Sequence, residues 1–282
     1  MTDSNTILAG CKINLGLNIT QRRPDGYHDL QTIFYPVPLF DELRIREVGD
    51  PPSIVSGNED RLTLAGNPLE GDVRDNLVLK AVRLLRSEGY EFPPLCIDLK
   101  KVIPSGAGLG GGSSDAACVL KAVAGQYGLP LSLEQMEQLA GRLGADCPFF
   151  IRCKPVYAEG IGDQFTSISL SLKGMYLLLV KPEVHVSTRE AYAGVHPHQP
   201  RFPLLETINL PVEQWKDRME NDFEQSIFAS HPLLSNIKQE LYRRGAVYAS
   251  MSGSGSTIFG LFRSQPSCGQ DFAEHFTFLC RL

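Results

Sequence analysis

Long hydrophobic runs are missing from this sequence. The longest aliphatic stretch of note, Met175–Val180, is far shorter than the ~20 residues that a membrane-spanning helix needs. Residues Met1–Thr6 contain no lysine or arginine and lead into no long apolar run, so a secretory signal is not expected. We therefore predict a soluble, cytoplasmic protein without a membrane partner.

A paired cysteine pattern is also absent. The chain has seven cysteines, an odd number, with no C-x-x-C pair among them, and they are scattered through apolar stretches. Disulfide frameworks belong to small secreted domains with paired cysteines. We expect reduced, mostly buried thiols at positions 11, 96, 118, 147, 153, 268 and 280.

An excess of positive charge is lacking as well, because the formal net charge is −5. Proteins that bind nucleic acid broadly show clustered lysine and arginine, so no nucleic-acid partner is expected. Local positive charge at Lys12, Arg22, Arg23, Lys100 and Lys101 still allows a nucleotide-sized ligand.

Composition and length indicate a globular protein with a large core. Hydrophobic residues make up 43% of the 282 residues and charged residues 21%, without internal repeats or low-complexity tracts. This length allows one large domain or two of ordinary size. We predict two domains, residues 1–157 and 158–282, because the sequence pattern changes after Pro155.

Apolar periodicity predicts mixed strands and helices. Ser132, followed three residues later by Gln135, indicates a capping box at a helix start. Residues 144–152 are expected to form a tight connection into a strand. The predicted strands are 6–19, 29–39, 42–47, 95–103 and 176–181, the helices are 76–88, 114–127, 132–143, 213–229 and 233–244, and residues 49–74 are a loop that allows short strands.

One segment is far richer in glycine than the rest. Residues 104–115 read Pro-Ser-Gly-Ala-Gly-Leu-Gly-Gly-Gly-Ser-Ser-Asp, with five glycines in seven positions and a helical pattern after them. Glycine allows positive φ and close approach of amide groups, and a helix start supplies unpaired N–H donors. Because a strand enters the segment and an apolar helix leaves it, we predict a phosphate-binding loop rather than a flexible linker.

The context of this loop excludes three common phosphate-binding families. A dinucleotide-binding fold requires a strand after the first helix, but a second helix is predicted here. A Walker loop requires lysine after its last glycine, where Ser113 stands. A protein-kinase loop is followed by V-A-I-K, H-R-D and D-F-G sequences, which the chain lacks.

The loop instead resembles the signature of the GHMP kinases, small-molecule kinases named for galactose, homoserine, mevalonate and phosphomevalonate. The resemblance extends to all three motifs of that superfamily: Lys12-Ile-Asn-Leu-Gly-Leu, the glycine loop, and Ser252-Gly-Ser-Gly-Ser256. Pro24-Asp-Gly-Tyr-His28 and Gly144-Ala-Asp-Cys-Pro148 narrow it to a branch whose small-molecule substrate carries a cytidyl group.

The resemblance implies an α+β fold of two domains with a cleft between them. The N-terminal domain would be ribosomal protein S5 domain 2-like and the C-terminal domain ferredoxin-like α/β. ATP is the implied phosphoryl donor, with Mg²⁺ expected alongside it through unidentified protein ligands. Lys100 is expected in solvent. The implied ATP-binding residues are Lys101, Pro104, Gly106, Gly108, Leu109, Gly110, Gly111, Gly112, Ser113 and Ser114.

Lys12 and Asp146 are the implied catalytic residues. From the residues alone, a turn-forming role for Asp146 is as well supported as a catalytic one, and Lys12 is expected on an exposed strand face. In the family the aspartate accepts the proton of the substrate hydroxyl, and the lysine orients that hydroxyl and offsets charge on the transferring group. Asp115 is predicted to cap its helix, with a magnesium contact as the alternative.

The implied substrate-binding residues come from four segments. Asn14 lies two residues after Lys12 and therefore on the same strand face. Tyr27 and His28 follow a turn and are either a loop anchor or one side of a clamp on cytosine. The full set is Asn14, Tyr27, His28, Tyr192, which would cover the other face of cytosine, and Ser252, Gly253 and Ser254, whose segment fits a plain hairpin equally well.

Two other functions stay open on the sequence. One is a GHMP kinase for a different alcohol, such as homoserine or a mevalonate derivative. The other is a nucleotide-binding module without catalysis, against which Lys12 and Asp146 argue because a passive binder needs no proton acceptor. The sequence predicts no particular oligomeric state.

Overall fold

Two compact units make up the part of the chain that the computed structural model describes, residues 6–48, 59–68, 71–267 and 272–282. Unit 1 takes its described residues from 1–11, 39–105 and 110–153, and unit 2 from 12–38, 106–109 and 154–282. Both units are therefore assembled from segments far apart in the sequence. The domain boundary at residue 157 stays a prediction.

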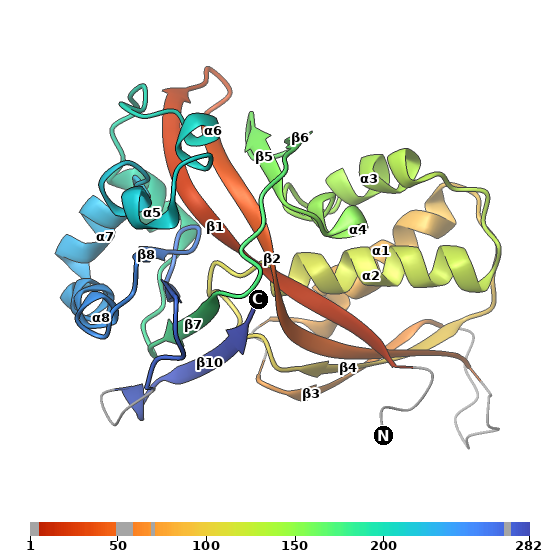
Figure 1. The fold of residues 1–282 in the computed structure, drawn as a ribbon. Helices are drawn as coiled ribbons and strands as arrows, with labels where there is room; N and C mark the ends of the chain where they lie inside the picture. Colours follow the sequence, from red (N-terminus) through yellow and green to blue (C-terminus); the bar gives the residue numbers. More distant parts are fainter. Residues whose placement is uncertain (1–5, 49–58, 69–70, 268–271) are drawn as a thin grey trace. The chain divides into compact units, whose positions relative to one another are not determined.

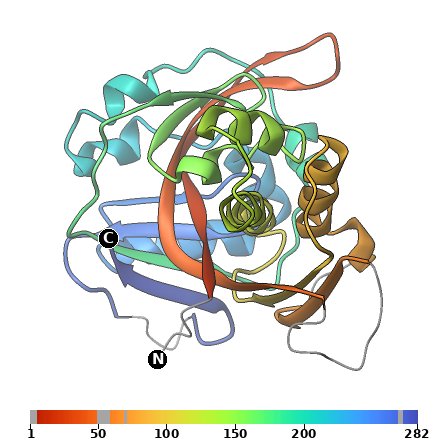
Figure 2. The ribbon, with the colours of Figure 1, turned by 90° about the vertical axis from the view of Figure 1, so that its right-hand side faces the viewer.

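Unit 1 consists of helices packed on strands. Strand β3 (Arg61–Gly66) pairs in parallel with β4 (Leu95–Lys101), and β4 pairs antiparallel with the last part of β2 (His28–Glu47). Helices α1 (Leu77–Ser87) and α2 (Gly111–Gln126) lie over these strands (Figures 1 and 2). A short 3₁₀ helix, Val73–Asp75, precedes α1.

Local sequence explains where these helices begin. The side chain of Asn76 accepts a hydrogen bond from Val78 N, which caps α1, and α1 turns one apolar face inward. The predicted capping box of Ser132 and Gln135 is confirmed at the start of α3 (Leu133–Gly141). The side chains that α1 buries are Val78, Leu79, Ala81, Val82, Leu84 and Leu85.

The structure adds detail to two predictions about elements and contradicts a third. The tight connection expected at 144–152 leads, as predicted, into a strand, β5 (Val156–Glu159), but it also contains the short helix α4 (Phe149–Arg152). This helix was not predicted, because periodicity cannot distinguish a buried strand from a buried helical turn in so short an apolar run. The stretch 49–74, predicted as a loop that allows short strands, contains the short strand β3, and its residues 49–58 and 69–70 lie outside the described part. The helix predicted over 213–229 is split into the 3₁₀ helix Val212–Asp217 and α7 (Glu224–Ser230).

The split before α7 has a visible cause. Asn221 forms an isolated parallel bridge with Leu17 of β1 (Ile7–Arg22), a strand that pairs with β2. Leu17 N donates to Glu220 O at 2.8 Å, and Asp222 N donates to Leu17 O at 2.9 Å. These backbone bonds replace helical ones, so a helix cannot continue through this segment.

Unit 2 is built on a four-stranded antiparallel sheet in the order β10-β7-β9-β8. The strands are β7 (Tyr176–Lys181), β8 (Tyr248–Met251), β9 (Ile258–Phe262) and β10 (Phe276–Arg281). Numbered along the chain, the order is 4-1-3-2, which is that of a ferredoxin-like sheet. The predicted strand 176–181 is confirmed, and α7 and α8 (Pro232–Arg243) lie beside the sheet in Figure 1.

The remaining elements of unit 2 are short. Strand β5 (Val156–Glu159) pairs with the first part of β2 and with β6 (Gln164–Ser167). Helices α5 (Thr188–Ala193) and α6 (Leu204–Thr207) follow β7. In the described ranges no helix combines the length and apolarity that a membrane crossing requires. The six described cysteines are all free thiols, and Cys268 lies outside the described residues.

Candidate functional site

Lys12 lies inside unit 2 rather than on an exposed strand face. Lys12 is only 4% exposed, and its Nζ donates a hydrogen bond to Asn14 Oδ1 at 2.7 Å. The same ammonium lies 4.8 Å from the centre of the Phe34 ring, and Asn14 Nδ2 donates to Thr32 Oγ1 at 3.0 Å. The prediction that Lys12 and Asn14 share one strand face is confirmed.

Three sequence motifs meet in unit 2. Lys12 N donates to Leu109 O at 3.0 Å, which joins the first motif to the glycine loop. The hydroxyl of Ser252, from the third motif, accepts from Asn14 N at 3.2 Å and donates to Gly108 O at 2.9 Å. One serine hydroxyl therefore connects the strand that carries Lys12 with the loop.

Two glycines make this close approach possible. Gly108 has φ +73°, and a Cβ there would lie 1.9 Å from the carbonyl oxygen of Ser252. Gly253 has φ +56°, and its Cβ would lie 3.4 Å from Asn14 Oδ1. Ser254 is half-buried in the hairpin between β8 and β9, and a hairpin was one of the two interpretations of this segment. Gly106, with φ +59°, begins this part of the loop.

Asn221 is a residue of this cluster that the sequence did not indicate. Its Nδ2 donates to Met251 O and Gly253 O, both at 2.8 Å, and its Oδ1 accepts from Phe223 N at 3.0 Å. The buried amide therefore holds the backbone around the third motif through its NH₂ group, while its oxygen fixes the backbone at the start of the segment that leads into α7. A single asparagine between helices offers no pattern from which this role could be predicted.

The aromatic residues of the predicted clamp take two different positions. His28 stacks on Tyr192 with ring centres 5.0 Å apart, and Tyr192 meets the edge of Phe223 at 4.9 Å. Tyr27 is 62% exposed, and its N–H donates to Asp25 Oδ1 at 3.0 Å. The structure thus brings His28 and Tyr192 together in direct contact, so a base cannot lie between these two rings in this arrangement.

Unit 1 carries the second half of the glycine loop and the helix behind it. Gly110 is the N-cap of α2 in the left-handed conformation, with φ 70° and no side chain to accept from the first turn. Gly112 is exposed and Ser113 is half-buried, whereas Ser114 is buried. Of the two serines, Ser113 is therefore better placed to reach a ligand; Pro104 is half-buried.

Lys101 and Asp115 form a buried ion pair in unit 1. Lys101 Nζ donates to Asp115 Oδ2 at 2.7 Å and to Asp41 Oδ2 at 2.5 Å. The prediction that Asp115 caps its helix was wrong, because α2 begins at Gly111 and Asp115 is already its fifth residue. Burial raises the pKa of Asp115 to about 7. The expectation for Lys100 is confirmed, since it is exposed and pairs with Glu42 at 3.0 Å.

Asp146 lies in a turn of unit 1, as its surroundings predicted. Cys147 N donates to Gly144 O at 3.1 Å, and the Asp146 side chain is half-buried. Burial raises the pKa of the Cys147 thiol to about 11, while a side-chain hydrogen bond with Ser113 lowers it. Ser113 at the start of α2 therefore lies next to the residue that follows Asp146.

A preformed magnesium site is not evident in the donor set. Among the described residues, no three or more histidine, cysteine, aspartate or glutamate side chains are grouped so that they could hold a metal ion. The carboxylate of Asp115, the acidic residue nearest the loop in sequence, is bonded to Lys101. These residues do not fit a metal held by the protein alone.

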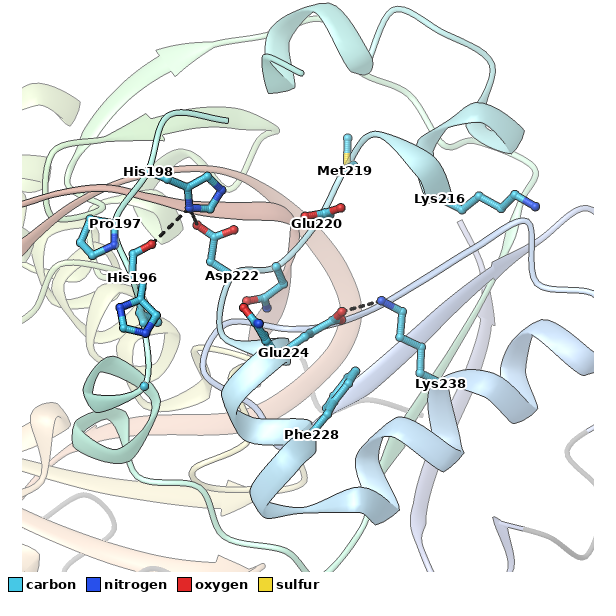
Figure 3. A pocket seen from close by; sticks show the side chains of 14 residues that line it. His196, Pro197, His198, Lys216, Met219, Glu220, Asp222, Glu224, Phe228 and Lys238 are labelled. Carbon is cyan, nitrogen blue, oxygen red and sulfur yellow. Dashed lines mark hydrogen bonds and ion pairs between the residues drawn. The ribbon is translucent and has the colours of Figure 1, made fainter. Parts of the chain in front are cut away.

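A pocket of about 700 Å³ lies elsewhere in unit 2 (Figure 3). His198 points towards Asp222, with 3.8 Å between Nδ1 and Oδ2, and Lys238 pairs with Glu224 at 2.5 Å. Burial raises the pKa of Asp222. Asn221 also lines the pocket, but none of the site residues predicted from the sequence does.

Comparison with known families places these features in one class of protein. The family "GHMP kinases N terminal domain" matches residues 76–154, and "GHMP kinases C terminal" matches residues 209–269. A protein of Bacteroides thetaiotaomicron named 4-diphosphocytidyl-2-C-methyl-D-erythritol kinase is 54% identical over 254 residues, 90% of each chain. The chain belongs to the GHMP kinases, which are ATP-dependent small-molecule kinases.

Solved structures agree with this membership. The crystal structure of 4-(cytidine 5'-diphospho)-2C-methyl-D-erythritol kinase has a TM-score of 0.78 and 31% identity, and the match covers 97% of each chain. The mevalonate kinase of Methanococcus jannaschii, at 16% identity, has a TM-score of 0.67 over 100% of this chain and 99% of its own, and shares the fold alone. The predicted α+β GHMP kinase fold is confirmed, and kinase membership favours catalysis over a passive binding module.

Proposed function

We propose that the protein phosphorylates the 2-hydroxyl of 4-diphosphocytidyl-2-C-methyl-D-erythritol with ATP, giving the 2-phosphate and ADP. The observation that carries this proposal is the 54% identity, over 90% of each chain, with a relative of that name. The reaction belongs to the non-mevalonate pathway to isoprenoid precursors. We expect a cytoplasmic enzyme with no nucleic-acid or membrane partner.

The chemistry requires a proton acceptor and compensation of negative charge. The substrate oxygen attacks the γ-phosphorus of ATP, the bond from that phosphorus to the bridging oxygen breaks, and ADP leaves. We assign the hydroxyl proton to the carboxylate of Asp146. We assign Lys12 to the developing negative charge, because its ammonium is buried and oriented by Asn14, and buried charges act strongly on their neighbours.

The glycine loop is assigned to the phosphates of ATP. Its positive-φ glycines expose backbone amides, and its second half leads into the start of the 16-residue helix α2. Ser113 would add a hydroxyl donor. We expect Mg²⁺ to arrive with the nucleotide, and when bound it would neutralise charge on the phosphates; the residues that the structure describes group no ligand set of their own.

The cytidyl end of the substrate is assigned to the aromatic residues of unit 2. His28 and Tyr192 already stack on each other, and the exposed ring of Tyr27 is free to cover a base. Stacking on aromatic side chains contributes about 1–3 kcal/mol per base in nucleic-acid complexes. Recognition of cytosine therefore requires Tyr27 to supply one face, with the His28–Tyr192 pair beside it.

A small panel of alcohols tests the assignment of the substrate. ADP release is measured with 4-diphosphocytidyl-2-C-methyl-D-erythritol, mevalonate, phosphomevalonate and homoserine at equal concentrations. We expect release with the cytidyl compound at a rate at least about a hundredfold above the others, because loss of the cytidyl contacts removes several kcal/mol of binding. Faster release with mevalonate or homoserine would contradict the proposal.

A further inference from the structure

Asp41 is a fully buried carboxylate that the sequence pattern did not single out. It lies on β2 at 0% exposure, and its Oδ1 accepts the backbone N–H groups of Val102 at 2.6 Å and Ile103 at 2.9 Å. These two residues join the end of β4 to Pro104, where the glycine-rich segment starts. One carboxylate oxygen therefore fixes the backbone that leads into the loop.

The second oxygen of Asp41 extends this connection to the far side of the loop. Asp41 Oδ2 accepts from Lys101 Nζ, which also donates to Asp115 Oδ2 at 2.7 Å. Asp115 lies in the second turn of α2, the helix that follows the loop. Lys101 Nζ is close to the loop itself, since a Cβ on Gly111 would lie 3.3 Å from it. Side chains thus tie the beginning of the loop to its end.

The charges of this trio argue against a purely stabilising role. Asp41, Lys101 and Asp115 are each at most 4% exposed, and two carboxylates face one ammonium. Burial and the charge of Asp41 both raise the pKa of Asp115. The Oδ1 atom of Asp115 has no hydrogen-bond partner in the described structure. Buried ionic groups of this kind are often no more stabilising than apolar residues of the same volume. Stabilisation of the fold therefore does not by itself account for these three buried charges, and a second role is expected.

We propose that Asp41 is a positioning residue which, through Lys101 and Asp115, holds the two ends of the glycine loop in register for the phosphates of ATP. The inference rests on the proposed ATP-binding role of that loop. Lys101 acts through the loop rather than as a direct ligand, because its ammonium is already bonded to two carboxylates. A preorganised loop binds phosphate without the entropic cost of ordering it first.

Asp41→Asn tests the first half of this connection. The amide oxygen can still accept from Val102 and Ile103, but its NH₂ group then faces the Lys101 ammonium, donor against donor. Binding of a β,γ-imido ATP analogue is measured by calorimetry at pH 8. We expect the Kd to rise about tenfold, which is about 1.4 kcal/mol, while the KM of the alcohol stays within about twofold. Asp98→Asn, a partly exposed carboxylate on the adjoining β4, is the matched control and should bind like wild type.

Asp115 gives a second pair of variants in case Asp41→Asn does not fold. Asp115→Asn keeps an oxygen acceptor for Lys101 and should bind the analogue like wild type. Asp115→Ala breaks the tie to α2 while removing an excess buried charge, so we expect weaker binding, by about fivefold, with no loss of melting temperature. A purely structural role would move stability and binding together.

Two results would overturn the inference. The first is analogue binding within about twofold of wild type by both Asp115→Ala and a folded Asp41→Asn, a change under 0.5 kcal/mol. The second is a wild-type protein that binds no nucleotide, which would remove the ATP role of the loop itself and the proposed function with it. Rejection of the cytidyl substrate alone would leave the positioning result intact, because calorimetry with the analogue does not involve the alcohol.

Discussion

The ammonium group of Lys12 illustrates how single residues of this enzyme acquire their properties. A lysine in an apolar strand is usually placed with its charge in solvent, but Lys12 is buried with Asn14 and the face of Phe34 around its charge. Burial of a charge is costly unless polar partners compensate. Such a residue is expected where its field acts on a reacting group rather than on the fold.

Asp146 provides the most direct residue-scale prediction. Asp146→Asn keeps the shape of the turn but removes the proton acceptor. We expect kcat to fall by about 10²- to 10⁴-fold, the usual contribution of a general base, with the Kd of the ATP analogue unchanged. Stopped-flow or steady-state ADP release measures the first quantity and calorimetry the second. Turnover close to wild type would exclude Asp146 as the base.

The raised pKa of Asp115 predicts that the stability of the folded protein depends on pH. Its pKa is raised from 3.8 to about 7 in the folded protein, so the folded state holds a proton that the unfolded chain releases between about pH 4 and pH 7. The free energy of unfolding therefore falls as pH rises through this window, and above pH 7 the folded protein bears the full cost of a buried, ionised Asp115. Asp115→Asn removes this cost, because the amide does not ionise.

Thermal unfolding at pH 5 and pH 8 tests this sign. The melting temperature of Asp115→Asn relative to wild type should be higher at pH 8 than at pH 5 by about 2 °C or more, equivalent to about 1 kcal/mol. A difference that is the same at both pH values would show that Asp115 does not titrate in this range.

Tyr27 predicts an effect confined to the cytidyl substrate. Its exposed ring has few structural duties, so Tyr27→Ala should leave the fold intact. Loss of one stacked base, about 1–3 kcal/mol, should raise the KM for the cytidyl substrate about fivefold or more, while the KM for ATP is unchanged. An unchanged KM for the cytidyl substrate would count against stacking by Tyr27.

At the scale of elements, the glycine loop shows what sequence can and cannot predict. Its glycine spacing, the strand before it and the helix after it were all apparent, because local patterns encode local structure. The hydrogen bond from Ser252 to Gly108 was not, and neither was the role of Asn221 in holding the third motif, since these residues come from segments that are remote in sequence. The helix α4 was missed for a related reason: three buried apolar residues in a row fit a strand or a helical turn equally.

Gly108 gives the element-scale prediction. Gly108→Ala places a Cβ 1.9 Å from the Ser252 carbonyl oxygen at a positive φ, so the hairpin and the loop must separate. We expect a loss of about 2 kcal/mol in stability and at least a tenfold rise in the KM for ATP. The matched control is Gly125→Ala on the exposed side of α2, where a Cβ meets nothing within 4 Å.

The control should change stability in the opposite direction. Alanine is favoured over glycine inside a helix by about 1 kcal/mol, so Gly125→Ala should be at least as stable as wild type with unchanged kinetics. Chemical denaturation and steady-state assays of both variants provide the comparison. Equal effects of the two substitutions would show that close approach at Gly108 is unimportant.

At the scale of the whole molecule, each of the two units draws on segments that are interleaved along the chain. The motifs predicted the chemistry and the family, and the 4-1-3-2 sheet of unit 2 bears out the ferredoxin-like expectation. A charged residue such as Asp41 could not be assigned, because its partners at residues 101–103 lie some 60 positions away along the chain. Long-range pairing of this kind is set by the fold and not by local pattern.

The position of the transferred phosphate tests the central claim most directly. The 2-carbon of the proposed substrate carries a methyl group and no hydrogen, so a phosphate on its oxygen has no neighbouring hydrogen for three-bond coupling. Proton-coupled ³¹P NMR of the reaction should therefore show a new phosphomonoester singlet, formed one-for-one with ADP, while the cytidyl diphosphate signals persist. A doublet or triplet would place the phosphate on another oxygen, and the absence of any monoester signal would contradict the account.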